Sequence, residues 1–195
     1  VLVMLGKRQA LMGKMFVRPY YALHPVARMP ARVPSELVLA IARRESEFDP
    51  YVISPVGARG LMQVMPKTAK EMADRVGLRY SQKRLETDWA YNARIGITYL
   101  EELAERYDGN PVLMSVAYNA GPSRADRWIE LMGDPRNDEV DVIDWIEMAP
   151  FQETRNYIMR VTESLPIYQA RLGKPIAPTR FKNMLKGSSL SLRAP

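Results

Sequence analysis

Two glutamates at the end of a predicted helix are the first candidates for chemistry in this sequence. Residues 34–48 have helical spacing, and the segment ends in the letters RRESEF. At about 100° per residue, Glu45 falls on the apolar stripe with Ile41, whereas Glu47 falls on the solvent side. A carboxyl on the core-facing stripe is costly to ionise, so we expect the pKa of Glu45 to rise, as a general acid at neutral pH requires. A buried glutamate paired with an arginine produces the same pattern.

Few other side chains in the sequence suit hydrolytic chemistry. The chain has no Cys and a single His, His24, which lies in a proline-rich stretch and which we expect to be a surface loop residue. This inventory excludes disulfides and thiolate sites, and it argues against a Ser-His-Asp triad and against a multi-histidine metal centre. Catalysis would therefore depend on carboxylates or hydroxyls, and we expect no metal and no cofactor.

A glycine-containing loop follows the first candidate helix. Residues 54–66 are SPVGARGLMQVMP, with two glycines three positions apart, which is typical of a tight loop close to another backbone or a ligand. The loop lacks the Lys-Ser/Thr ending of a phosphate-binding loop. Ser54 and Gln63 could reach a sugar or the Glu45 carboxyl. The loop could equally be structural.

A second polar segment closes a later predicted helix. Residues 117–122 are AYNAGP, so Tyr118 and Asn119 stand just before a glycine turn. In a cleft, the tyrosine would offer a flat surface and the asparagine an amide that both donates and accepts hydrogen bonds. A core tyrosine and a capping asparagine would fit the same letters, and periodicity does not decide between these interpretations.

Composition and charge limit the class of protein. The chain has 195 residues, 47% of them hydrophobic and 26% charged, which suits one folded domain with a core. The net charge of +6 permits binding to anionic polymers, but Lys and Arg are interleaved with Asp and Glu, as on a solvated surface. No apolar run reaches the roughly 18 residues of a membrane span, and no segment has the pattern of a signal peptide.

The periodicity predicts an all-α fold. Apolar stripes, first-turn prolines and capping residues predict helices over 1–16, 34–48, 66–77, 88–107, 111–121, 123–132, 140–148 and 152–172. Thr87 or Asp88 can cap the fourth of these helices, and Asn110 can cap the fifth. Residues 51–54 could form a short strand. Pro166 predicts a kink in the last helix.

Short motifs between residues 45 and 157 form an ordered set. They are Glu45-Ser46, Ser54, Gly57-Ala58, Gly60-Leu61-Met62-Gln63, Met65-Pro66, Thr68-Ala69, Asn92, Gly96, Ala117-Tyr118-Asn119-Ala120-Gly121, Trp128, Glu147, Pro150, Glu153-Thr154-Arg155 and Tyr157. Each motif is weak alone, but all of them in this order and at these spacings resemble the catalytic domain of the soluble lytic murein transglycosylases. The resemblance covers about residues 33–172.

The resemblance implies a lysozyme-like, mostly helical fold and a division of the chain into three parts. Residues 1–32 would be a helix and a proline-rich linker, the end of an upstream helical region. Residues 33–173 would form the catalytic domain, and residues 174–195 a polar tail. The protein would act on peptidoglycan in the periplasm or cell envelope as a monomer, with no nucleic acid and no membrane span.

The resemblance also implies a reaction. The substrate would be the β-1,4 bond between N-acetylmuramic acid and N-acetylglucosamine. Glu45 matches the family's acid, which protonates the leaving oxygen and then takes the proton of the sugar's 6-hydroxyl, so that a 1,6-anhydro ring closes. One carboxyl acts as acid and then as base, an exception to the two-carboxylate rule of glycosidases.

The family pattern assigns roles to seven further residues. Ser54 would hydrogen-bond near Glu45. The cleft would be lined by Gln63, Met65, Tyr118 and Asn119. Glu153 and Tyr157 would contact the acetamido region or shape the pocket, although Glu153 could instead pair with Arg155 or another arginine.

Two other functions fit parts of the sequence. A goose-type lysozyme or phage endolysin on the same fold would hydrolyse the bond, and would ordinarily need a second carboxylate to activate water, for which Asp49, Asp126 and Glu153 are candidates. A basic helical nucleic-acid-binding module would need a concentrated Arg/Lys face, whereas the charges here are dispersed along the chain.

Overall fold

The computed structural model describes residues 2–175 and 181–187, and this part of the chain is helical, which confirms the predicted all-α class. The helices in chain order are α1 (Leu2–Leu11), α2 (Val17–Tyr20), the 3-10 helix η1 (Pro25–Arg28), α3 (Ser35–Ser46), α4 (Pro66–Arg75), α5 (Gln82–Thr87), α6 (Trp89–Arg106), α7 (Pro111–Ala120), α8 (Pro122–Met132), α9 (Val142–Glu147), α10 (Gln152–Arg171) and α11 (Phe181–Leu185). The possible strand at 51–54 is reduced to an isolated bridge between Ile53 and Arg59.

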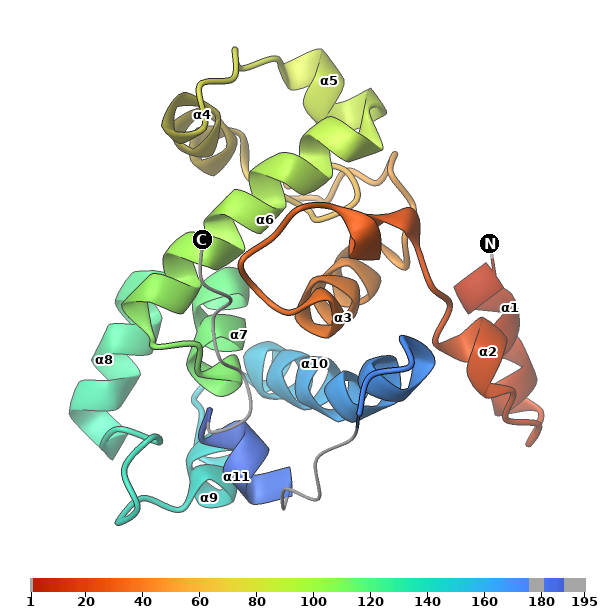
Figure 1. Ribbon diagram of the computed structural model, residues 1–195. Coiled ribbons are helices and arrows are strands. Elements are labelled where there is room, and N and C mark those ends of the chain that lie inside the picture. The colour runs from red at the N-terminus through yellow and green to blue at the C-terminus, as the bar shows by residue number, and fades with distance from the viewer. Residues whose placement is uncertain (1, 176–180, 188–195) are drawn as a thin grey trace.

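Helix α3 lies at the centre of the fold. It packs along α10 and against η1 (Figure 1). Helix α10 also packs against α7. Helix α6 contacts α7 and also α4 and α5, at the far end of the molecule. Every residue from Leu37 to Arg43 is buried, so α3 has no solvent face over this stretch. The turn after this stretch is less enclosed, because Arg44 and Glu45 are only partly buried.

The predicted solvent position of Glu47 is wrong. Glu47 follows the end of α3 in a left-handed conformation with a φ of 53°, so the helical rotation used for the prediction no longer applies to it. Its side chain is 21% exposed, forms an ion pair with Lys7, and lies 3.9 Å from Arg43 Nε. Phe48 is also left-handed, with a φ of 64°, and the two residues turn the chain sharply away from the helix.

The predicted capping residues hold at two helices, and a predicted first-turn proline holds at a third. Asp88 accepts a hydrogen bond from the Tyr91 amide at the start of α6, and Asn110 accepts one from the Leu113 amide at the start of α7. Pro66 opens α4 as expected. The short helix α5 was not predicted, because its six residues are too few for a helical period to be recognised.

His24 lies in a loop, as predicted, but it is not a freely exposed surface residue. His24 is partly buried between two aromatic rings, stacked on Phe48 at 5.3 Å and edge-on to Trp89 at 4.9 Å. Its Nδ1 accepts a hydrogen bond from the Val26 amide and so caps η1. Burial lowers the pKa of His24. The proline-rich segment therefore packs on the helical core through His24.

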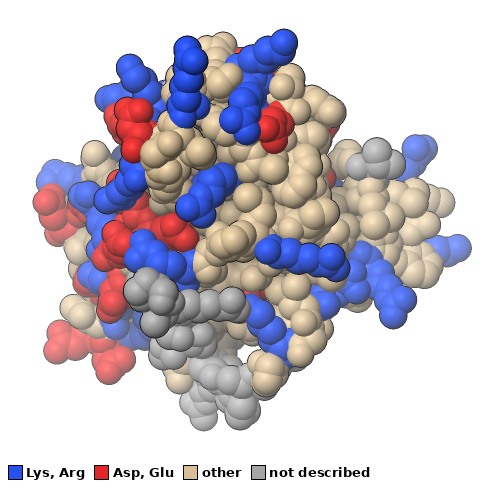
Figure 2. Space-filling view, turned by 45° about the horizontal axis from the view of Figure 1, so that its top comes forward, with Lys and Arg blue, Asp and Glu red and all other residues tan. Residues whose placement is uncertain are grey.

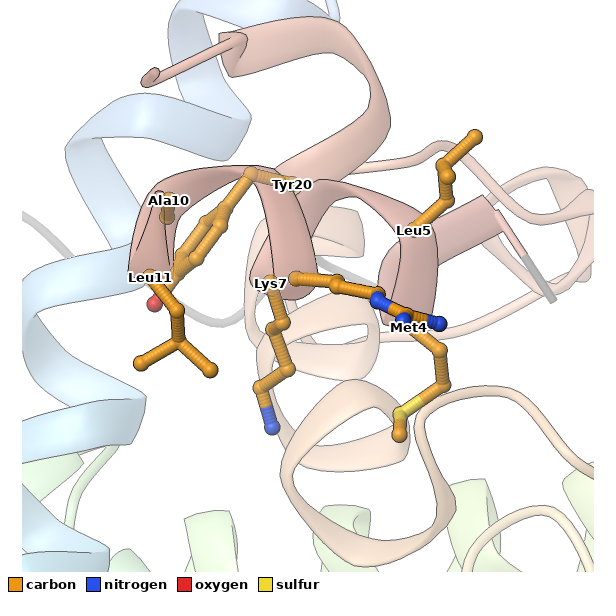
Figure 3. A pocket seen from close by; sticks show the side chains of 7 residues that line it. Met4, Leu5, Lys7, Ala10, Leu11 and Tyr20 are labelled. Atoms are coloured by element: carbon orange, nitrogen blue, oxygen red, sulfur yellow. The ribbon is translucent and has the colours of Figure 1, made fainter. Parts of the chain in front are cut away.

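Helices α1 and α2 lie together at one side of the molecule (Figure 1). Along α1 is an open hollow of about 810 Å³, lined by Met4, Leu5 and Leu11 among other α1 residues and by Tyr20 of α2 (Figure 3). Several large apolar side chains here are exposed, with Leu11 at 90%. No other described residue covers them, and an upstream helical neighbour for this face stays a prediction.

The C-terminal region, predicted as a polar tail, contains more structure within its described residues. Residues 181–187 include α11, whose Met184 and Leu185 are buried. Asn110 donates from Nδ2 to the Leu185 carbonyl at 2.9 Å, which ties this segment to the start of α7. The rest of 176–195 lies outside the described residues.

Charged side chains of both signs are mixed over the face shown in Figure 2. The α1–α2 side differs, because residues 2–32 contain six Lys or Arg and no Asp or Glu. Within the described residues, no helix is both long enough and apolar enough to span a membrane.

Candidate active site

Glu45 lies in the last turn of α3, beside α10. Its side chain is partly buried. Tyr157, a buried residue of α10, donates a hydrogen bond from Oη to Glu45 Oε1 at 2.5 Å. These two residues are 112 positions apart, so the packing of α10 on α3 is what brings the phenol to the carboxyl.

Burial raises the pKa of Glu45 to about 7. The hydrogen bond from Tyr157 and the positive charge of Arg44 act in the opposite direction, and the charge of Glu153 raises the value further. A carboxyl with this pKa is protonated in a large fraction of molecules at neutral pH and also loses its proton readily. It can therefore serve as an acid and then as a base.

The raised pKa predicts the pH dependence. Because the folded value of about 7 lies above the 4.5 of an ordinary glutamate, the protonated form stabilises the fold at low pH, and this contribution is lost as the pH rises towards and through 7. If Glu45 is the acid, kcat/KM falls on the basic side of pH 7.

We predict that in Tyr157→Phe the fall of kcat/KM on the basic side of the pH profile, the basic limb, moves to a pH higher by roughly one unit. The reason is that the lost hydrogen bond stabilises the Glu45 carboxylate. The measurement is the pH profile of kcat/KM. Tyr168→Phe is the matched control, since Tyr168 is a buried tyrosine of the same helix whose hydroxyl donates to the Ala22 carbonyl. A limb that stays in place or moves downward in Tyr157→Phe contradicts the prediction.

The loop after α3 is held by side chains from three helices. Ser46, next to Glu45, donates to the Leu61 carbonyl at 2.7 Å. Tyr118 of α7 donates to the Met62 carbonyl at 2.8 Å. Asn92 of α6 accepts from the Met62 amide at 2.8 Å. The loop is thereby fixed to α3, which carries Glu45, and to α6 and α7.

Two glycines allow this loop to approach α6 closely. A Cβ on Gly60 would lie 2.3 Å from Asn92 Nδ2 and 2.6 Å from the Leu85 carbonyl oxygen, and the φ of Gly60 is +73°. A Cβ on Gly96, one helical turn after Asn92, would lie 2.6 Å from Met62 Sδ. Only glycine fits either position without moving the loop or the helix.

A cavity of about 320 Å³ lies between this loop and α7. It is lined by Gln63, Val64, Met65, Thr68, Tyr99, Tyr118, Asn119, Ala120, Gly121 and Pro122. Tyr118 connects the cavity to the acid, because the Glu45 charge is among the causes that raise the pKa of this buried phenol, after burial itself. The structure thus brings Gln63, Met65, Tyr118 and Asn119 together at one cavity, and their contact with a glycan stays a prediction.

Two further predicted site residues, Ser54 and Glu153, are not among the residues that line this cavity. Ser54 accepts a hydrogen bond from the Ala58 amide at 2.9 Å and so stabilises its own loop. Glu153 is exposed in the first turn of α10. The suggested partner of Glu153, Arg155, donates instead to the Glu147 and Ala149 carbonyls.

Three residues at the site received no role from the sequence. Asn92 and Thr154 are buried and belong to the quoted motifs, but only the fold shows what they contact. Arg44 lies with its guanidinium carbon 5.6 Å from the centre of the Tyr157 ring and acts on the Glu45 charge. Buried polar residues inside helical stripes are the signal that could have identified the first two.

The fold and this site define a class: a helical domain in which a carboxyl of raised pKa acts electrostatically on a tyrosine that lines a cavity of amide and phenol groups. The chain belongs to the family described as Transglycosylase SLT domain, which matches residues 26–140. The soluble lytic murein transglycosylase of Escherichia coli K12 is 37% identical over 142 residues, 72% of this chain and 21% of that protein. The chain therefore spans about a fifth of the length of this curated relative.

Solved structures give the same relationship. The 70 kDa soluble lytic transglycosylase SLT70 of Escherichia coli matches with a TM-score of 0.79 and 31% identity, over 88% of this chain and 28% of that chain. A complex of the 70 kDa soluble lytic transglycosylase with bulgecin A matches with a TM-score of 0.77 and 29% identity, over 91% of this chain and 29% of that chain. An inactive mutant of lytic transglycosylase Slt from Pseudomonas aeruginosa matches with a TM-score of 0.66 and 39% identity, over 73% of this chain and 22% of that chain.

Proposed function

We propose that this domain is a peptidoglycan lytic transglycosylase that cleaves the β-1,4 bond between N-acetylmuramic acid and N-acetylglucosamine in the periplasm. The observation that carries this proposal is the partly buried Glu45 carboxyl with a pKa of about 7, whose charge acts on Tyr118 in the lining of a polar cavity. Membership of the Transglycosylase SLT domain family supports the substrate class. The domain acts as a monomer on glycan strands, without a nucleic acid partner.

The reaction uses Glu45 twice. The protonated carboxyl donates its proton to the glycosidic oxygen while the bond from that oxygen to the muramoyl C1 breaks. The acetamido oxygen of the same sugar stabilises the cation at C1. The Glu45 carboxylate then takes the proton of the 6-hydroxyl, whose oxygen bonds to C1 and closes the 1,6-anhydro ring. No water is consumed and the acid is regenerated.

The cleft residues have supporting parts in this scheme. Tyr157 holds the carboxyl through its hydrogen bond, and Tyr118 offers an aromatic surface for a sugar ring. Gln63, Met65 and Asn119 contact the glycan along the cavity that they line. Ser54 keeps the loop in shape, and Glu153 contributes negative charge near Glu45.

A hydrolase is the second candidate function, and one observation favours it. Of the three carboxylates suggested for water activation, Asp126 is paired with Arg106 and hydrogen-bonded to Tyr107, and Asp49 accepts from the Tyr51 amide. Glu153 is exposed and close enough to Glu45 to act on its charge. It is the candidate through which water could replace the sugar's own hydroxyl.

Digestion of purified sacculi followed by mass spectrometry of the muropeptides decides between these functions. We expect muramoyl products one water lighter than those of a lysozyme digest run in parallel. Products of the lysozyme mass would establish hydrolysis instead. Glu153→Gln is the accompanying variant: the transglycosylase reaction retains most of its rate in this variant, whereas a hydrolase that relies on Glu153 for water activation does not.

A further inference from the structure

Two amide side chains that line the cavity, Gln63 and Asn119, are held in opposite orientations: one by its nitrogen and the other by its oxygen. Gln63 donates from Nε2 to the Val52 and Gly60 carbonyls, both at 2.9 Å, so its amide nitrogen is occupied. Its backbone is left-handed, with a φ of 48°. The side-chain oxygen Oε1 remains as a hydrogen-bond acceptor at the cavity that Gln63 lines.

Asn119 is held the other way round. Its Oδ1 accepts a hydrogen bond from the Thr154 hydroxyl at 2.8 Å. Within the described residues no hydrogen bond engages Asn119 Nδ2, and this atom is not among the buried polar atoms that lack a partner. The nitrogen is therefore a donor at the cavity, which Asn119 also lines.

Thr154 has a hydroxyl free for this contact because of its place in α10. Thr162, further along the same helix, donates to the Ile158 carbonyl four residues earlier. Thr154 is in the first turn, so the carbonyl four residues before it lies outside the helix. It is 2% exposed and donates across the helix interface to α7. A buried hydroxyl that donates to no carbonyl of its own helix favours the amide orientation that offers it an acceptor oxygen.

We propose that Thr154 is a positioning residue that fixes the Asn119 amide with Nδ2 towards the cleft, where it donates to an acceptor oxygen of the bound glycan. Together with Gln63 Oε1, the cleft then presents one fixed donor and one fixed acceptor. Thr154 does not touch the substrate, and it acts through Asn119. This proposal rests on the proposed function, because the ligand is taken to be an amino-sugar chain.

The test uses the whole chain carrying Glu45→Gln, so that no glycan is cleaved, and titrates the β-1,4-linked tetramer of N-acetylglucosamine by calorimetry. We expect Thr154→Val to weaken binding about fivefold, the effect of one net hydrogen bond. Thr154→Ser keeps the hydroxyl and restores the parent affinity. Thr162→Val is the matched control, a valine at an equally buried threonine of the same helix, and leaves the affinity unchanged.

A double-mutant cycle separates positioning from a general loss of structure. In an Asn119→Ala background, Thr154→Val has no further effect on affinity if it acts through the amide. An equal loss in both backgrounds, or an unchanged affinity in Thr154→Val alone, overturns the positioning role. With the active enzyme on sacculi, Thr154→Val raises KM and leaves kcat near the parent value.

The two levels of the proposal fail in different ways. A wild-type protein that releases no muropeptides from sacculi, or a parent that binds no tetramer, overturns the proposed function together with the inference built on it. A wild-type protein with full lytic activity, combined with an unchanged Thr154→Val affinity, overturns only the role of Thr154.

Discussion

Glu45→Gln is expected to remove the lytic activity of this domain on purified sacculi, with a fall in kcat of roughly 10² to 10⁴-fold, the typical contribution of a general acid and base. Glutamine keeps the shape of the side chain and still accepts a hydrogen bond from Tyr157, but it has no proton to donate to the leaving oxygen. The measurement is the release of soluble muropeptides with time. The loss is carried by kcat, because the glycan contacts along the cavity are unchanged.

The fold is expected to survive this substitution. Because burial raises the pKa of Glu45, an ionised carboxylate at this position costs free energy, and the neutral glutamine avoids that cost. Glu45→Gln should therefore be at least as stable as the wild type at pH 8, as measured by thermal unfolding. A variant that is inactive because it is unfolded would leave the catalytic assignment without support.

Glu47→Gln is the control two residues away. Glu47 pairs with Lys7 and lies near Arg43, but it has no contact with the cleft residues among those described. We expect activity within about twofold of the wild type and a change in the free energy of unfolding of no more than about 1 kcal/mol, as for partly exposed ion pairs. If Glu47→Gln is the inactive variant and Glu45→Gln the active one, the assignment of the acid is wrong.

Asn92→Ala is expected to have the largest effect on stability. Asn92 is fully buried and makes three hydrogen bonds: it accepts from the Met62 amide and donates to the Arg59 and Leu85 carbonyls. Alanine leaves these three backbone groups without partners in the interior. The expected loss is about 3–5 kcal/mol, which lowers Tm by roughly 10 °C in a chain of this size.

Activity should fall in Asn92→Ala even below its Tm, because Asn92 holds the loop that carries Gln63 and the carbonyl to which Tyr118 donates. Thermal unfolding and lytic assays on the same preparation measure the two effects. Asn156→Ala, at an exposed position of α10, is the matched control and should change Tm by less than about 2 °C. A Tm within 2 °C of the wild type in Asn92→Ala itself contradicts the role given to Asn92.

The sequence by itself determined the local features of this protein. The spacing of apolar residues predicts the longer helices, and Asp88 and Asn110 predict where two of them begin, because caps and periodicity act within a few residues of the chain. The sequence also singled out Glu45, since a carboxyl on an apolar stripe has few functions other than ion pairing. The motif resemblance added the family, which the comparisons support.

The tertiary structure alone decided how distant segments meet. The contacts of Tyr157 with Glu45 and of Thr154 with Asn119 both depend on α10 packing against helices far away in the sequence, which periodicity does not encode. Glu47 was misplaced because a left-handed backbone ends the helix at Ser46, two residues before the predicted end at residue 48. Glu45 is thus a candidate acid from its place in one helix, and its pKa of about 7 is set by burial and by the charges and hydrogen bond that three-dimensional packing places around it.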